Sequence, residues 1–171
     1  MTLGVALVHR HNEAERDRGL HLLAQVSKLF VDRGRFLGDL GALRVLSARE
    51  RALRGERDDE IALIRAAVDH LFRYGQLLAW GISATGVLVE TLLDRAIEGD
   101  LAEAEAAIER MANAPAEDEL AVRDVWLLRL RALVARARGD SERYRDYRDR
   151  YRDMAEALGF EGHIAWAEAM P

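Results

Sequence analysis

Histidine is the first residue type that could carry chemistry here, because imidazole titrates near neutral pH and is a common metal ligand. His9 and His11 lie two residues apart, whereas His21, His70 and His163 are isolated along the chain. A zinc site would need further ligands from elsewhere in the sequence. The spacing therefore favours packing or helix-boundary positions for the isolated histidines, and we expect no metal site.

Signatures of nucleophilic and phosphate chemistry are also missing from the sequence. The chain contains no cysteine, which excludes disulfides, thiolate metal sites and cysteine nucleophiles. No serine stands in a nucleophile elbow, and no glycine-rich loop resembles a phosphate cradle. An enzyme would require convergent polar side chains such as His70 beside Glu90, and no spacing favours that arrangement. We expect no enzyme, no catalytic residue and no cofactor.

Arginine alternates with tyrosine and aspartate between residues 143 and 153. Arginines and aromatic rings together can bind nucleic acid through its phosphates and bases. Asp146, Asp149 and Asp153 offset the arginines at helical spacing, which predicts a salt-bridged helix face behind a tyrosine stripe. Tyrosine and arginine are also frequent anchors of protein interfaces. A protein-partner surface is therefore the alternative interpretation.

The balance of charge argues against nucleic-acid partners. The formal net charge is −5 at pH 7, whereas nucleic-acid binders usually present a basic surface to the phosphates. The apolar stretch 1–8 is too short to span a bilayer, and no small-residue cleavage site follows it. We expect a soluble, cytoplasmic protein that contacts neither nucleic acid nor membrane directly.

The elements that must position these residues are predicted to be helices joined by repeated turns. Alanine, leucine, arginine and glutamate dominate the chain, as is typical of helices. Glycine followed by an acid recurs at intervals of 44 and 40 residues, at Gly55-Glu56, Gly99-Asp100 and Gly139-Asp140. Such a glycine can end one helix in the left-handed conformation, and the acid can cap the next. Each step therefore predicts a tight turn between two antiparallel helices.

The segment after each turn carries the same apolar spacing. Apolar residues recur at i, i+3, i+7 and i+10, which places them in one stripe on a helix. The three stripes are Ile61, Ile64, Val68 and Leu71; Leu101, Ala104, Ile108 and Met111; and Tyr144, Tyr147, Tyr151 and Met154. A stripe that narrow must be covered by a neighbouring helix, which stacked repeats supply.

These patterns predict an all-α fold of seven to eight helices. Asn12 is expected to cap a helix that ends near Arg33, and Glu15 is placed for a capping box. The remaining helices are expected at about 36–54, 59–74, 83–97, 101–113, 117–138, 141–158 and 162–169. We expect a single domain over 1–171, in which 1–35 is an N-terminal helix with a less certain start. Residues 36–171 would form a right-handed α-solenoid of antiparallel helix pairs, about three and a half tetratricopeptide-like repeats.

Several strings resemble a known family of helical regions. They are QLLAWG at 76–81, GVLVETLLDR at 86–95, DVWLLRLR at 124–131 and LGFEGHI at 158–164. These strings resemble the C-terminal tetratricopeptide-like region of large bacterial regulators. Such regulators join a class III adenylate cyclase domain, or a LuxR-type DNA-binding domain, to a signal-transduction ATPase and then to helical repeats. The resemblance covers roughly 40–171.

What the resemblance implies is a sensory or scaffold arm rather than a catalytic part. Cyclases of that class use metal-binding aspartates on a sheet, which a helical chain does not offer. The ATPase would need a lysine in a phosphate-binding loop, and the only lysine, Lys28, lies outside any such loop. A protein or peptide partner is expected, and the resemblance implies a cyclase, ATPase or regulator domain.

The expected function is therefore a non-catalytic interaction or regulatory module. Trp80, Trp126 and Trp166 are expected in apolar helices, and they would mark a binding site if they converged on one groove. The alternative is a small-molecule sensor with a closed cavity lined by Trp80 and Trp126. A homodimer is a further expectation, because solenoid ends without a polar capping helix expose apolar surface. The candidate partner-binding residues are Trp80, Trp126, Tyr144, Tyr147 and Tyr151.

Overall fold

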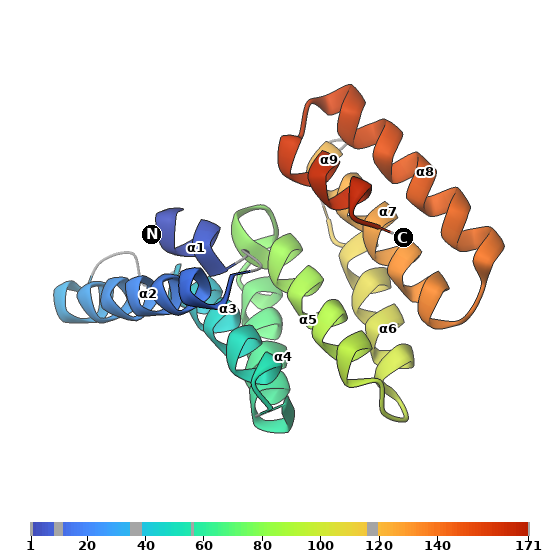
Figure 1. Cartoon of the computed structure of the whole chain (residues 1–171). Helices are drawn as coiled ribbons and strands as arrows, with labels where there is room; N and C mark the ends of the chain where they lie inside the picture. The colour runs from blue at the N-terminus through green and yellow to red at the C-terminus, as the bar shows by residue number, and fades with distance from the viewer. Residues whose placement is uncertain (1, 9–11, 35–38, 56, 116–119, 171) are drawn as a thin grey trace. The chain divides into compact units, whose positions relative to one another are not determined.

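The structure is a computed structural model, and it is helical throughout the residues it describes (Figure 1). These are residues 2–8, 12–34, 39–55, 57–115 and 120–170, none of which lies in a strand. The helices in these ranges are α1 (Thr2–Val8), α2 (Glu13–Arg33), α3 (Leu40–Leu53), α4 (Arg57–Arg73), α5 (Ile82–Arg95), α6 (Asp100–Ala112), α7 (Ala121–Ala137), α8 (Ser141–Leu158) and α9 (Glu161–Glu168). The all-α prediction is confirmed, while the right-handed solenoid stacking stays a prediction.

The chain divides into two compact units, Met1–Thr91 (unit 1) and Leu92–Pro171 (unit 2). The division falls within α5, so unit 1 contains α1 to α4 and most of α5, and unit 2 contains α6 to α9. Eight of the helices correspond to the predicted map, and α1 is an addition to it. The single-domain organisation stays a prediction.

In unit 1, α2 begins and ends as its sequence predicts. The Asn12 side-chain oxygen accepts hydrogen bonds from the backbone N–H groups of Ala14 and Glu15, at 2.9 and 3.3 Å. Gly34 ends the helix in the left-handed conformation, with φ of 59°. α1 packs against α2 where both backbones come close, since a Cβ on Gly19 would lie 2.9 Å from the backbone nitrogen of Val8. That approach requires glycine.

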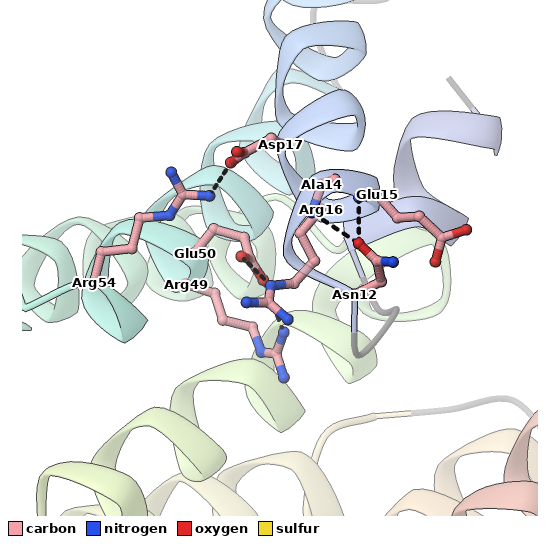
Figure 2. A network of polar contacts seen from close by, with 8 residues as sticks. All are labelled: Asn12, Ala14, Glu15, Arg16, Asp17, Arg49, Glu50 and Arg54. Carbon is pink, nitrogen blue, oxygen red and sulfur yellow. Dashed lines mark hydrogen bonds and ion pairs between the residues drawn. The ribbon is translucent and has the colours of Figure 1, made fainter.

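The α3–α4 hairpin supplies much of the core of unit 1. Gly55 turns the chain with φ of 115°, and α4 then buries its predicted stripe, Ile61, Ile64, Val68 and Leu71. Two acids are buried beside these apolar residues. Glu50 forms ion pairs with Arg16 and Arg49 at 3.2 and 3.5 Å (Figure 2). Glu60 accepts two hydrogen bonds from Arg51, one of them at 2.7 Å. A carboxylate at such depth requires this kind of pairing.

A π-helical turn, η2 (Leu77–Gly81), leads into α5. The carbonyl of Gln76 accepts hydrogen bonds from the backbone N–H groups of both Trp80 and Gly81, at 3.2 and 3.0 Å. The strand-like run 86–89 is helical, as predicted from its apolar surroundings. Among the described residues, the stretch Leu77–Arg95 is long and apolar enough to cross a membrane, but most of it is buried inside the protein.

Unit 2 contains the other two predicted Gly-acid turns. Gly99 and Gly139 have φ values of 91° and 75°. The buried carboxylate of Asp100 accepts hydrogen bonds from Arg95 at 3.0 and 2.6 Å and from the backbone N–H of Ile97 at 3.1 Å. Asp140 caps α8 by accepting from the backbone N–H of Arg143 at 3.1 Å. α7 packs between α6 and α8, which explains why its buried residues lie on more than one side.

Candidate functional site

The best-formed hollow of unit 2 lies between α6, α7 and α8. Its volume is about 390 Å³, and its lining combines an apolar floor with a charged rim. Ile108, Val134 and Ala135 form the floor, and all three are buried. The rim residues are Glu105, Glu109, Arg131, Arg138, Asp140 and Arg143, with Tyr147 beside them. Three arginines and three acids make the rim neutral overall.

The rim charges form ion pairs that bring the three helices together. Glu109 of α6 pairs with Arg131 of α7 at 3.3 Å, and Glu105 pairs with Arg138 at 2.5 Å. These pairs are partly or largely exposed, so each contributes little to stability and can exchange its partner at small cost. The rim can therefore release an arginine or a carboxylate to an incoming ligand.

Arg143 is the rim cation that is most open to solvent. Its side chain is 70% exposed and lies 3.5 Å from its nearest acid, Asp140. A guanidinium in this position can bind a carboxylate in a two-pronged arrangement. Arg143 is the residue of the rim best placed to recognise an acidic group.

Tyr147 lines the hollow, whereas Tyr144 lies one turn earlier on α8 and is not among the lining residues. Both rings are half-buried. Arg148 lies over the Tyr144 ring at 5.7 Å, and Arg150 lies over the Tyr147 ring at 5.9 Å. The two tyrosines therefore have similar surroundings except for the hollow.

The exposed face of α8 carries the predicted salt bridges. Arg150 pairs with Asp146 at 3.2 Å, and Asp149 pairs with Arg148 at 2.9 Å and with Arg152 at 3.8 Å. The salt-bridged interpretation of this segment is confirmed. The tyrosine stripe behind it is buried to different depths along its length.

Tyr151 belongs to the core of unit 2. Its side chain is 0% exposed and packs with Val125 of α7 and Ala167 of α9. The Tyr151 hydroxyl and Nδ1 of His163 are 2.9 Å apart and share a hydrogen bond. Complete burial leaves no surface of Tyr151 for a partner to touch, so its predicted contact role is corrected to a core role.

His163 stands at the centre of an aromatic cluster, which comprises Trp126, Tyr151, Phe160, His163 and Trp166. Trp126 is buried and meets Trp166 edge to face, with ring centres 5.6 Å apart. Burial lowers the pKa of His163 from 6.5 to about 4, and the positive charge of Arg129 lowers it further in the same direction. The imidazole is therefore neutral at physiological pH, and it acts as a packing and hydrogen-bonding group.

Arg129 covers the outer side of this aromatic cluster. Its guanidinium lies 4.7 Å from the Trp166 ring centre and 5.4 Å from that of Trp126. Trp126 therefore contributes mainly to the core, which corrects its predicted role as an exposed partner anchor. The sequence analysis did not single out His163 and Trp166, although their i,i+3 spacing on one short helix indicated a shared face.

Trp80 lies in unit 1, on η2, and is half-buried. Its Nε1 donates a hydrogen bond to Asp39 at 2.8 Å, which fixes the indole against the start of α3. The five predicted contact residues thus fall into three groups: Trp80 in unit 1, Trp126 and Tyr151 in the core of unit 2, and Tyr144 and Tyr147 on α8.

A second, more open hollow of about 600 Å³ lies between α7 and α8. Leu127, Leu128 and Met154 supply its apolar surface, and Arg131 lines both hollows. Neither hollow is lined by Trp80 or Trp126, the residues that were expected around an effector cavity.

Residues that could support acid–base or metal chemistry are engaged elsewhere. The His70 ring packs on Tyr74 with centres 4.5 Å apart, and Glu90 forms an ion pair with Arg49 at 3.7 Å. Among the residues that the structure describes, no group of three or more histidine, aspartate or glutamate side chains could hold a metal ion. His9 and His11 lie outside the described residues.

No protein-family model, curated protein or solved structure matches the chain significantly.

Proposed function

We propose that unit 2 is a non-catalytic protein-interaction module that binds a short peptide segment of a partner in the hollow between α6, α7 and α8. The observation that carries the proposal is the combination of a buried apolar floor, a rim of exchangeable ion pairs and a half-buried tyrosine. Binding sites of this kind gain affinity from one apolar side chain that fills the floor, while polar groups around it set orientation.

The chemistry of the hollow favours one type of peptide. Ile108, Val134 and Ala135 offer room for an apolar side chain of the partner. Arg143 is exposed beside this floor and can pair with a carboxylate. The preferred segment would therefore carry an acidic residue close to a leucine-like or aromatic side chain.

The resemblance to bacterial regulators suggests the origin of such a segment. A sensory or scaffold arm would bind a cyclase, ATPase or DNA-binding regulator domain, either in the same polypeptide or in a separate one. The chain itself would then contribute recognition and no catalysis.

A small-molecule effector is the alternative occupant of the same hollow. Its volume of about 390 Å³ lies within the roughly 300–1,000 Å³ typical of small-molecule sites. The charged rim favours the peptide, because an apolar effector would leave six charged side chains to be desolvated or displaced.

Peptide selection with matched variants tests the proposal. Random peptides displayed on phage would be enriched on the immobilised chain, and the affinity of the best sequences would be measured by fluorescence anisotropy. We expect Tyr147→Ala to weaken binding about tenfold or more, as loss of an aromatic anchor usually does. Tyr144→Ala is the control, because it removes the same side chain one turn away from the hollow.

Either of two outcomes would overturn the peptide proposal. One is enriched peptides that bind Tyr147→Ala as tightly as the unchanged chain. The other is a failure to enrich any peptide combined with a small molecule that protects the chain against thermal unfolding and loses this effect in Tyr147→Ala. The second result would establish the effector alternative.

A further inference from the structure

One side of α2 carries apolar residues that neither α1 nor α3 buries completely. α2 is attached to α3 by the pairs Arg16–Glu50 and Asp17–Arg54, which lie close together in Figure 2. α1 covers a second side, where Gly19 meets Val8 and Leu23 is buried. These contacts determine which sides of α2 face unit 1.

A third side of α2 forms a regular stripe. Glu15, Leu22 and Leu29 recur every seven residues, while Val26 and Arg33 follow Leu22 and Leu29 by four. These intervals are close to whole helical turns, so the five side chains share one side of the helix. Leu29 is 44% exposed, Leu22 and Val26 are half-buried, and Glu15 and Arg33 are exposed. The stripe thus has an apolar centre with an acid at one end and a base at the other.

The order of these residues is complementary to its own reverse. When two copies of α2 lie antiparallel and are centred on Ala24, Leu22 of one copy faces Val26 of the other. In the same register, Glu15 of one copy faces Arg33 of the other. A two-fold axis repeats each contact, so the interface contains two apolar pairs and two opposite-charge pairs. The spacing also matches that of antiparallel helix pairs in coiled coils.

We infer that the chain forms a symmetric dimer through antiparallel pairing of α2 with α2 of a second copy. The dimer surface is on unit 1, and its existence does not depend on the peptide hollow of unit 2. Charge complementarity selects a second copy as the occupant, because the acid and the base that face each other belong to the same helix. Burial of Leu29 and Val26 supplies the apolar part of the interface.

A second explanation exists for the charges alone. Acids in the first turn and bases in the last turn stabilise a helix through its dipole, and Glu13 shares this position with Glu15. The dipole effect does not require Glu15 and Arg33 to meet. Variants that reverse these charges therefore separate the two explanations.

Sedimentation velocity over a range of concentrations is the first test. We expect the unchanged chain to shift from the mass of one chain to twice that mass as concentration rises. Leu29→Asp should reduce the dimer association constant at least tenfold, because it places a charge at the centre of the interface. Val31→Asp is the matched control, since Val31 is also exposed on α2 but lies on another side. Circular dichroism would verify that both variants keep their helices.

Charge exchange tests the register. Glu15→Arg and Arg33→Glu should each weaken the dimer about fivefold or more, and the double variant should recover most of the loss. Glu13→Arg, which makes the same change one residue outside the stripe, should leave the dimer unchanged. A chain that stays monomeric at every concentration overturns the dimer. Equal losses for Leu29→Asp and Val31→Asp, or a double variant that is weaker than both single variants, overturn the antiparallel α2 interface.

Discussion

The α3–α4 hairpin of unit 1 and the α7–α8 hairpin of unit 2 share a glycine turn and an apolar stripe, yet different contacts hold them together. In the first, the buried carboxylates of Glu50 and Glu60 pair with arginines. In the second, the ring of Tyr151 is buried against α7 and α9 and bonded to His163. One hairpin therefore depends on charge compensation and the other on the volume and shape of aromatic rings.

This difference teaches that a repeated sequence pattern can specify the positions of helices without specifying how they are held. The two hairpins should consequently respond to different substitutions. Loss of ring volume should matter most in unit 2, and loss of a single charge should matter most in unit 1.

The largest effect is expected from Tyr151→Ala. Removal of a fully buried ring leaves a cavity and should lower the free energy of unfolding by about 3–5 kcal/mol. Tyr144→Ala, on the same helix but half-exposed, should cost about 1 kcal/mol or less. Chemical denaturation followed by circular dichroism measures both. Equal losses would contradict the core role of Tyr151.

A smaller effect is expected when the buried charge of unit 1 is removed. Glu50→Gln leaves Arg16 and Arg49 without their shared carboxylate and should cost about 1–3 kcal/mol. Both arginines are partly exposed, and water therefore limits the loss. Asp32→Asn serves as the control, because its pair with Lys28 lies on the surface and contributes about 0.5 kcal/mol or less. A Glu50→Gln variant as stable as this control would show that the buried pairs contribute little.

The smallest effect concerns pH and unit 2. The folded-state pKa of His163 is about 4, below its value of 6.5 in an unfolded chain. Between these two values the unfolded chain binds more protons, so stability is fully present above pH 6.5 and falls as the pH drops towards 4. The ring is partly exposed, and solvent screening reduces the expected loss to about 1 kcal/mol. His163→Phe should remove this part of the pH dependence, whereas His21→Phe, at an exposed site on α2, should retain it.

Local signals explain why some helices could be predicted closely. The bounds of α8, Ser141–Leu158, agree with the prediction because Asp140 caps one end and Gly159 turns left-handed at the other. α2 is bounded by Asn12 and Gly34 in the same way. Each of these signals acts within a few residues of the helix end, so the sequence contains it in readable form.

Features that depend on distant contacts could not be predicted. α1 is only seven residues long, too short to be stable alone, and it relies on close packing with Gly19. The stripe of α8 identified which side of the helix packs but not how deeply each tyrosine is buried. That depth depends on α7 and α9, which cover Tyr151 and leave Tyr144 and Tyr147 half-exposed.

The candidate site was only partly visible in the sequence for the same reason. Tyr147 was singled out, but its association with Ile108 and Val134 arises from three helices that pack together. Trp126 was expected to anchor a partner, yet Trp166 and Arg129 cover it. Residue type identified good anchors, and packing determined which of them remain accessible.

The most direct test of the peptide site is to map a selected peptide on the chain by two-dimensional NMR of backbone amides. The account predicts that the largest shifts on titration fall at residues around the hollow, such as Ile108, Val134 and Tyr147, and that Tyr147→Ala abolishes them at the same peptide concentration. Shifts confined to other parts of the chain, or shifts that persist unchanged in Tyr147→Ala, would contradict it.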